Sequence, residues 1–296
     1  GPDEKGIWIN EDNKLVLSHR RLSIIDLSVK GSQPMHSSCN RFVIIFNGEI
    51  YNHHEIKKQI LSSKSISFKG HSDTEILLES ISLFGLDTAI KNTKGMFAFA
   101  LWDKKKKILS LVRDRFGEKP LYYSKINNNF IFASELKAFK KIEFFKKDLN
   151  INSIKKFLKY SYIPAPNTVF KNVYKLMPST ILEISEDLKN IKEKKYWSLK
   201  KSFNKKIISQ SEILDDVYKN INNIIKSQMI SDAPIGSFLS GGTDSTLVSL
   251  VMQQNMSKKL DTFSIGYKDT KYDESYYYRK ISNIIGSNNH EIILSE

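Results

Sequence analysis

Cysteine is nearly absent from this sequence: Cys39 is the single one among 296 residues. One cysteine can form neither an internal disulfide nor a cysteine-built zinc site, and both absences fit a reducing cytoplasm. Long apolar runs are missing as well, since no segment approaches the ~20 residues that a membrane-spanning helix needs. The first residues, Gly-Pro-Asp-Glu-Lys, do not resemble a signal peptide. We therefore expect a cytoplasmic protein without a membrane partner.

Arginine is also scarce, and this decides how the net charge of +14 is interpreted. Only 6 of the 46 basic residues are arginines, whereas surfaces that read phosphates and bases usually rely on the planar guanidinium group. The densest lysine run, residues 104–107, stands between two apolar stretches, where a solvated hairpin tip is expected. A lysine-rich surface that favours solubility explains this pattern, and we expect no nucleic-acid partner.

The pattern of apolar residues divides the chain in two. Up to about residue 200, short β-rich runs alternate with Asn, Asp, Gly and Lys turns. Helical spacing is found there at 73–84, with Ser72 or Asp73 as the cap, and at 152–160, opened by Asn152 or Ser153. A mostly polar stretch, 200–209, predicts a linker. We predict an α+β domain over 1–200 and an α/β domain over 210–296.

The second domain is expected to contain a parallel sheet. A long amphipathic helix is predicted at 211–229, followed by a strand at 235–239, a helix at 245–254 and a strand at 262–265. A strand, a helix and a second strand at this spacing form a βαβ unit, whose strands are parallel.

The turn inside this βαβ unit has the composition of a phosphate-binding loop. Residues 238–245 read Phe-Leu-Ser-Gly-Gly-Thr-Asp-Ser. Glycines let an anion approach the backbone, and the N-terminus of the next helix favours negative charge. Asp244 could hold Mg²⁺ against the phosphates. The alternative is an ordinary tight turn in which Asp244 or Ser245 caps the helix.

These residues resemble the PP-loop of ATP pyrophosphatases, enzymes that cleave ATP to AMP and pyrophosphate while they adenylate a substrate. The resemblance implies that ATP and Mg²⁺ are bound here. Leu239 and Ile265 would border the adenine, Asp244 would hold the metal, and the phosphates would be bound by Ser240, Gly241, Gly242, Asp244 and Ser245.

The N-terminal half contains further clusters, each with a simple alternative explanation when taken alone. They are Leu-Ser-His-Arg-Arg-Leu-Ser-Ile-Ile-Asp at 17–26, Phe-Asn-Gly-Glu-Ile-Tyr-Asn-His at 46–53, His-Ser-Asp-Thr-Glu at 71–75, Gly-Met-Phe-Ala-Phe at 95–99, Arg-Asp-Arg-Phe-Gly-Glu-Lys-Pro-Leu-Tyr-Tyr at 113–123 and Ala-Ser-Glu-Leu-Lys-Ala at 133–138. Asn47-Gly48, for example, is a common hairpin turn. Taken together and in this order, the clusters resemble glutamine-hydrolysing asparagine synthetases over nearly the whole chain.

The resemblance implies a class II glutaminase domain with a four-layer αββα sandwich of the N-terminal-nucleophile type, followed by a PP-loop synthetase domain. Arg21 would pair with the α-carboxylate of glutamine, in a pocket that Leu22, Ser23, Ile24 and Ile25 also line. Glu49 and Asp73 would bind its α-ammonium group. Asn47 and the Gly48 N–H would stabilise the oxyanion. Ammonia would then amidate aspartate through an acyl-adenylate, and a homodimer is possible.

The family's nucleophile is an N-terminal cysteine, whose α-amino group serves as the base, and Cys39 cannot take this role inside the chain. We therefore expect a fragment that lacks both ends of the parent protein and that neither hydrolyses glutamine nor makes asparagine. A homologue that has lost its glutaminase activity is the rival interpretation. Two other functions stay open: the amidation of another carboxylate, such as a sugar acid or a peptide precursor, and RNA modification by a PP-loop protein.

Overall fold

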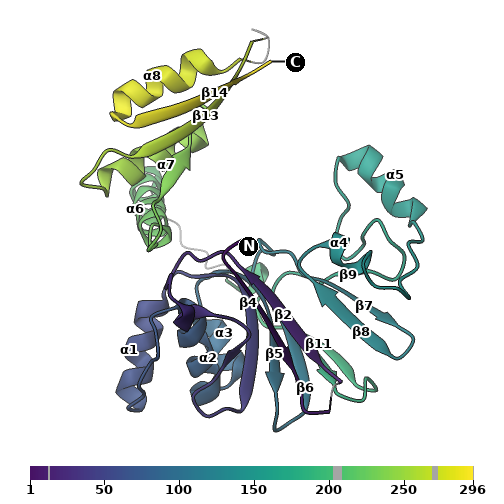
Figure 1. Ribbon diagram of the computed structural model, residues 1–296. Coiled ribbons are helices and arrows are strands. Elements are labelled where there is room, and N and C mark those ends of the chain that lie inside the picture. The colour runs from purple at the N-terminus through teal and green to yellow at the C-terminus, as the bar shows by residue number, and fades with distance from the viewer. Residues whose placement is uncertain (13, 203–208, 269–272, 296) are drawn as a thin grey trace. The chain divides into compact units, whose positions relative to one another are not determined.

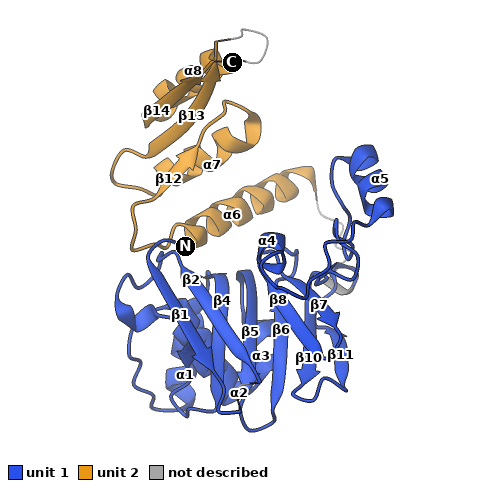
Figure 2. Ribbon diagram, turned by 45° about the vertical axis from the view of Figure 1, so that its right-hand side comes forward, with its two compact units in different colours: residues 1–204 blue, residues 205–296 orange. Residues whose placement is uncertain are grey.

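The computed structural model describes residues 1–12, 14–202, 209–268 and 273–295. The chain divides into two compact units, residues 1–204 and 205–296 (Figure 2). Residues 203–208 of the predicted linker lie outside the described residues.

The larger unit is built on a six-stranded antiparallel sheet with the order β11-β10-β6-β5-β4-β3. Its strands are β3 (Met35–His36), β4 (Phe42–Ile50), β5 (Gly95–Asp103), β6 (Ile108–Arg113), β10 (Thr180–Ser185) and β11 (Ile191–Lys195). The predicted hairpin tip at 104–107 is the turn between β5 and β6. Asn47 and Gly48 lie inside β4, opposite Ala98 and Phe97, so the hairpin explanation of this dipeptide is wrong.

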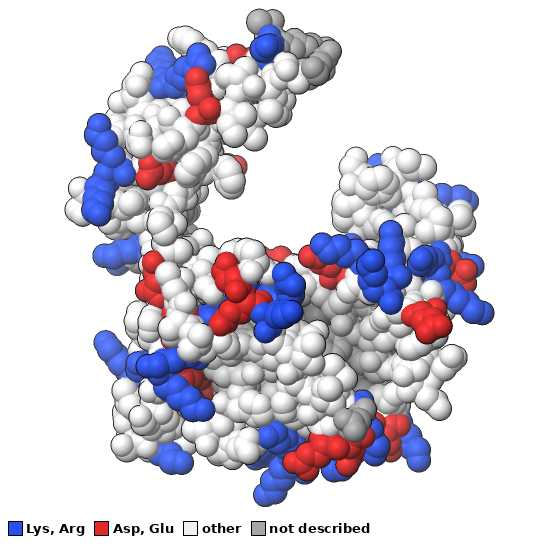
Figure 3. Space-filling view, viewed as in Figure 1, with Lys and Arg blue, Asp and Glu red and all other residues white. Residues whose placement is uncertain are grey.

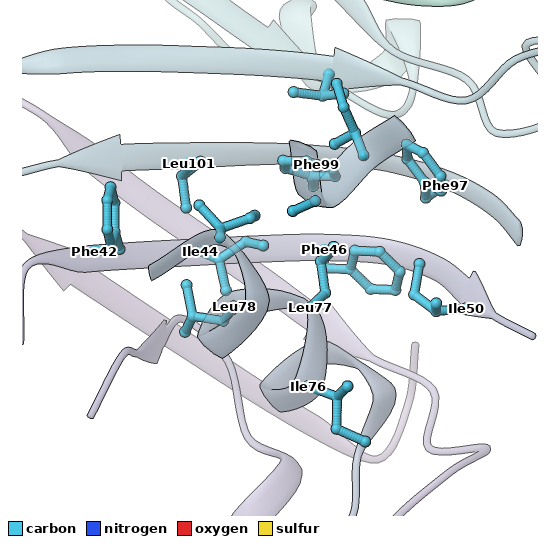
Figure 4. Packing of buried hydrophobic residues seen from close by; sticks show 14 of the residues in the cluster. Phe42, Ile44, Phe46, Ile50, Ile76, Leu77, Leu78, Phe97, Phe99 and Leu101 are labelled. Carbon is cyan, nitrogen blue, oxygen red and sulfur yellow. The ribbon is translucent and has the colours of Figure 1, made fainter. Parts of the chain in front are cut away.

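Both faces of the sheet are buried, because successive side chains of a strand point to opposite faces. Phe42, Ile44 and Phe46 on β4 face a helical layer, where they pack with residues of α2 such as Leu77 (Figure 4). Val43 lies in a separate core on the opposite face. The helical layer contains α1 (His53–Ser63), α2 (Asp73–Phe84) and α3 (Leu86–Asn92), on one side of the sheet in Figure 1.

The helix predicted at 73–84 is confirmed as α2, with the expected cap. The Ser72 side chain accepts a hydrogen bond from the backbone N–H of Glu75, which satisfies one of the free donors of the first turn. The helix ends at Gly85, whose φ of 82° is unfavourable for residues with a Cβ atom. This cap fixes the position of Asp73 as the first residue of α2.

Two smaller sheets cover the opposite face of the six-stranded sheet. They are β1 (Glu4–Ile9) with β2 (Val16–Arg21), and β8 (Asn129–Ala133), β7 (Tyr122–Ile126) and β9 (Tyr174–Lys175). The core on this face joins Leu17 of β2 to Phe132 of β8 and to Leu121, which directly precedes β7. The structure also contains α4 (Leu136–Phe139), α5 (Ile151–Tyr160), η1 (Val29–Gly31) and η2 (Leu199–Ser202). The cap of α5 is Asn150, not Asn152 or Ser153, and the four-layer arrangement stays a prediction.

The smaller unit confirms the predicted parallel sheet. Its elements are α6 (Gln210–Gln228), β12 (Gly236–Phe238), α7 (Thr243–Gln254), β13 (Asp261–Tyr267), α8 (Ser275–Ile285) and β14 (Asn288–Leu294). Both β12 and β14 pair with β13 in parallel. On β13, Thr262 and Ser264 are buried, whereas Phe263 and Ile265 on the other face are exposed. None of the described helices is both long and apolar enough to cross a membrane.

Candidate functional site

A cavity of about 1030 Å³ in the larger unit is lined by residues of β2, β4, β8 and the start of α2. Most of the predicted glutamine-site residues lie in its wall: Arg21, Leu22, Ile24, Ile25, Asn47, Gly48, Glu49 and Asp73. Ser23 is not among the lining residues, and its backbone N–H donates to the Asp3 carboxylate at 2.7 Å. The cavity therefore brings together sequence clusters that start at residues 17, 46 and 71.

The edge of β4 presents a row of backbone donors to this cavity. In an antiparallel strand, alternate residues direct their N–H groups to the same edge. Here the Phe46 N–H donates to the Gln33 side chain at 2.6 Å and the Ile50 N–H to the Asp73 carboxylate at 2.8 Å. Gly48 lies between them and has the same orientation. Its ladder partner Phe97 uses its own N–H and C=O with Asp114 on the other side, which leaves the Gly48 N–H directed at the cavity.

Glycine is required at position 48 by close packing against β5. A Cβ atom there would lie 2.1 Å from the Met96 carbonyl oxygen and 2.6 Å from the Cα of Phe97, far inside any normal contact distance. The backbone of β4 can therefore approach β5 only with glycine at this place. Packing against β5 therefore requires the glycine in the cluster at 46–53, in addition to the donor role of its N–H group.

Two acidic side chains in the cavity are held in a poorly solvated environment. Burial raises the pKa of Asp73 to about 6, although hydrogen bonds from Ile50 and Thr74 act in the opposite direction. Burial also raises the pKa of Glu49; the charge of Asp73 adds to this effect and Lys119 opposes it. Because both charged forms are disfavoured by burial and by each other, a cation bound beside them would be strongly favoured.

The guanidinium group of Arg21 is buried and already has several partners. Nη1 donates to the Ser28 carbonyl at 2.9 Å and contacts Glu4 at 3.2 Å. Nη2 donates to the carbonyl oxygens of Ile25 and Asp26. Arg21 therefore shapes the loop after β2, and a bidentate pair with a ligand carboxylate would require at least Glu4 to give way. The role predicted for Arg21 stays a proposal.

Asp26 fixes the loop that carries Ile24 and Ile25. Its carboxylate accepts hydrogen bonds from the Ser28 N–H at 3.1 Å and the His71 N–H at 2.9 Å. Burial acts to raise its pKa, but these bonds and the Ser28 hydroxyl lower it overall. Asp26 thus joins the loop after β2 to the segment that leads into α2, and it holds two walls of the cavity together.

Asp114 plays a similar part for the cluster at 113–123. Its carboxylate accepts hydrogen bonds from the backbone N–H groups of Phe97, Phe116, Glu118 and Lys119 at 2.9–3.2 Å. Arg113 donates to the Lys119 carbonyl at 2.8 Å. The N–H and the carbonyl group of Lys119 are thus both hydrogen-bonded, and Lys119 lines the cavity. This cluster organises the wall of the site.

In the smaller unit, the predicted phosphate loop joins β12 to α7. Gly242 is the N-cap of α7 and provides no side chain for the first-turn donors, so the interpretation in which Asp244 or Ser245 caps the helix is wrong. Gly241 has a φ of +83°, and a Cβ atom there would lie 2.7 Å from both the Tyr277 Cβ and the Tyr278 nitrogen. The loop therefore leaves the first N–H groups of α7 available for an anion.

The remaining predicted residues of this loop differ in exposure. Leu239 is buried, and its N–H donates to the Phe263 carbonyl at 2.9 Å. The hydroxyl groups of Ser240 and Ser245 lie 3.0 Å apart and bond to each other. Asp244 lies in the first turn of α7, and Ile265 on β13 is exposed. Among the described residues, no group of three or more His, Cys, Asp or Glu could hold a metal ion.

Comparisons with known proteins match two different family models to the chain. Residues 1–197 match the family model "Glutamine amidotransferase domain", and residues 216–296 match "Asparagine synthase". A putative asparagine synthetase [glutamine-hydrolyzing] 2 of Methanocaldococcus jannaschii is 35% identical over all of this chain and 60% of its own length. Asparagine synthetase [glutamine-hydrolyzing] 1 of Bacillus subtilis is 34% identical over all of this chain and 45% of its length.

The chain belongs to the glutamine amidotransferase domain family over residues 1–197. It spans about half the length of the curated relatives it matches. The chain is also similar to a protein with another name: amidase chry2 of Gibberella zeae is 30% identical over all of this chain and 45% of its own length.

Sequence reasoning missed three residues that the structure places in the wall of this cavity. Gln33 and Thr74 both lie in the cavity wall, next to Phe46 and Asp73 respectively. His19 lies there too, with a pKa lowered by burial and a contact to the Phe46 carbonyl acting against this. The alternation of Leu17, His19 and Arg21 along one strand was a signal for His19. Gln33 had no comparable signal, because its partner is 13 residues away.

Proposed function

We propose that this chain forms the glutaminase domain, over residues 1–200, and the beginning of the ATP-binding synthetase domain, over 210–296, of an enzyme that amidates aspartate. Glutamine and water would give glutamate and ammonia in the first domain. Aspartate and ATP would give an acyl-adenylate and pyrophosphate in the second. Ammonia would then displace AMP and form asparagine.

The observation that supports the first half best is the Gly48 N–H between two occupied neighbours on the edge of β4. A donor fixed in this way, with the Asn47 side chain beside it, could stabilise an oxyanion on a glutamine carboxamide without reorganisation. Glu49 and Asp73 would bind the α-ammonium group, which their raised pKa values favour. Arg21, Leu22, Ile24 and Ile25 would surround the α-carboxylate, and Ser23 would support their loop through its bond to Asp3.

In the second half, the first-turn N–H groups of α7 would bind the phosphates of ATP, because no side chain caps them. Ser240, Gly241, Gly242 and Ser245 would shape this cradle. Leu239 and Ile265 would border the adenine. Asp244 would hold Mg²⁺, which would supply charge neutralisation on the phosphates when it is bound.

Isothermal titration calorimetry with L-glutamine tests the first half without requiring turnover. The folded chain should bind L-glutamine and discriminate against D-glutamine, because the ammonium and carboxylate groups have separate partners. A folded chain that gives no heat with L-glutamine would contradict the proposal. For the second half, the intact natural protein should release pyrophosphate from ATP and Mg²⁺ only when aspartate is present.

A second candidate function is the amidation of a different carboxylate. It is favoured by the likeness to amidase chry2, which extends over the whole of this chain. Release of pyrophosphate with sugar acids or peptide carboxylates, and none with aspartate, would favour it. RNA modification has less support: on the face drawn in Figure 3, lysine and arginine side chains lie among acidic ones. A homodimer stays a prediction, which light scattering would test.

A further inference from the structure

Gln33 is a buried polar side chain in the cavity wall, 9% exposed. Its Oε1 accepts a hydrogen bond from the Phe46 N–H at 2.6 Å, and its Nε2 lies 3.5 Å from the Thr74 hydroxyl oxygen. Because a backbone N–H can only donate, the orientation of the carboxamide is determined by Phe46. The first contact is short and the second is at the limit of a hydrogen bond, so the bond to Phe46 is the dominant one.

Gln33 replaces a missing strand partner for β4. The short strand β3 pairs with β4 only at Met35–Ile44 and His36–Val43. Phe46 lies two residues further along the same edge, and the oxygen that accepts its N–H is the side-chain oxygen of Gln33. This side chain thus continues the hydrogen bonding of the edge for one step beyond β3, up to the point where Asn47 and Gly48 begin.

The Nε2 atom of Gln33 approaches Thr74, which is next to Asp73, the proposed acceptor of the ligand's ammonium group. Thr74, which Gln33 contacts, follows Asp73 in α2, and its backbone N–H donates to the Asp73 carboxylate at 2.8 Å. A single carboxamide therefore connects the strand that carries the proposed oxyanion donors to the helix that carries the proposed ammonium acceptor. The two elements are separate in the sequence, because β4 ends at Ile50 and α2 begins at Asp73.

We propose that Gln33 is a positioning residue that holds the Gly48 N–H and the Asn47 side chain at a fixed place relative to Asp73. A ligand's carboxamide and its α-ammonium group are then recognised together. This inference rests on the proposed glutamine-binding function. Gln33 itself touches no reacting atom: it acts through Phe46, and small errors in the position of a donor are costly in preorganised sites.

The test compares two ligands that differ only at the carboxamide. L-Norvaline keeps the α-carboxylate, the α-ammonium group and the carbon chain of L-glutamine but ends in a methyl group. The 296-residue chain and its variants are titrated with each ligand by calorimetry. The preference for glutamine over norvaline reports on Asn47 and Gly48, whereas the affinity for norvaline reports on the rest of the pocket.

Gln33→Met keeps the length of the side chain and leaves the Phe46 N–H buried without an acceptor. We expect the preference for glutamine to fall about tenfold, the scale of one lost hydrogen bond, with norvaline affinity within about twofold. Gln33→Glu keeps an acceptor oxygen in place and should restore most of the preference. Gln59→Met, the same substitution at an exposed position of α1, is the matched control and should leave both affinities and the preference unchanged.

An unchanged preference in folded Gln33→Met would overturn the inference, as would an equal loss for both ligands. If the wild-type chain is folded and does not prefer glutamine, the proposed function fails and the inference with it. Should Gln33→Met not fold, the wild-type chain still decides: the Phe46 amide must be protected from hydrogen exchange although it lies beyond β3. Exchange of this amide as fast as in an open edge strand would contradict the inference.

Discussion

The two candidate sites in this chain use different physical means to bind charged groups. In the larger unit, buried side chains provide the charges, and hydrogen bonds to backbone N–H groups hold them in place: Asp73 accepts from Ile50 and Thr74. In the smaller unit, the binding groups are backbone N–H donors at the start of α7, whose cap residue is Gly242. The proposed binding would thus depend on charge in a poorly solvated cavity at the first site and on the geometry of the main chain at the second.

This contrast determines which substitutions should be harmful in each unit. Where a buried carboxylate binds a cation, removal of its charge is the most damaging change. Where the main chain binds an anion, side chains can be exchanged at modest cost, and a change that alters the backbone is the most damaging. Single substitutions can therefore test each half of the contrast separately.

The largest effect is expected for Asp73→Asn in the larger unit. The substitution removes the negative charge and leaves one acceptor oxygen for two backbone donors, Ile50 N–H and Thr74 N–H. Loss of one partner of a buried charge pair costs about 2–5 kcal/mol, so affinity for L-glutamine should fall about 30-fold or more. Calorimetry measures this directly. Asp87→Asn, at an exposed ion pair with Lys194, is the control and should bind glutamine like the wild type.

In the smaller unit, the most damaging change should be Gly241→Ala. The φ of +83° disfavours alanine, and the new methyl group would also meet Tyr277 and Tyr278; strain of this kind costs about 1–3 kcal/mol. We expect weaker binding of ATP, by about fivefold to 100-fold, and a lower midpoint of urea unfolding.

Gly286→Ala separates strain from packing in that experiment. Gly286 has a φ of +74°, but nothing lies within 4 Å of the place that a Cβ atom would take there, and it ends α8 away from the phosphate loop. The variant should lose about 1 kcal/mol of stability and keep its affinity for ATP. Equal affinity losses in both variants would mean that Gly241 matters only through general stability.

The same contrast explains what the sequence could reveal. The phosphate loop is contiguous, so its glycines, its acid and its βαβ context could be recognised in eight residues, and the parallel sheet was confirmed. The cap of α7 was harder: Asp244 and Ser245 are favoured cap residues, yet Gly242 occupies this position because the loop turns earlier.

The cavity of the larger unit is assembled from distant segments, so its residues were predicted only through resemblance to a family. Helical periodicity predicted α2, and short β-rich runs predicted the strands; several of these runs are almost continuously apolar because both faces of the six-stranded sheet are buried. It could not predict that Arg21 is engaged with Ser28, Ile25 and Asp26, nor that Gln33 serves β4. Such contacts depend on where loops close, which local patterns do not determine.

A smaller effect is expected for Asp244→Asn. Asp244 lies in the first turn of α7, and an exposed carboxylate contributes little unless a metal ion is present. In the presence of Mg²⁺, affinity for ATP should fall by up to about fivefold, the scale of an exposed ion pair. Without Mg²⁺ the variant should bind ATP as well as the wild type or better, because a negative charge near the phosphates is gone. A loss of equal size with and without Mg²⁺ would contradict a role in metal binding.

The smallest effect, and the one that best separates binding from stability, is the pH dependence of the larger unit. Asp73 must be ionised to bind an ammonium group, and its pKa is raised to about 6. Affinity for glutamine should therefore fall about fourfold between pH 7.5 and pH 5.5, as protonation of one such group requires, and somewhat more if Glu49, whose pKa is also raised, titrates with it.

Stability should change in the opposite direction. A carboxyl group with a pKa higher in the folded than in the unfolded state binds more protons when folded, so it favours folding below its unfolded pKa of 3.8, and this contribution is lost as pH rises through about 6. In the wild type, this contribution is masked by acids such as Asp26 and Asp103, whose lowered pKa values make the folded state less stable as pH falls. The difference in unfolding free energy between wild type and Asp73→Asn isolates it: relative to the variant, the wild type should gain stability from pH 6 to pH 4. If that difference stays constant while glutamine affinity still falls, a group other than Asp73 controls binding.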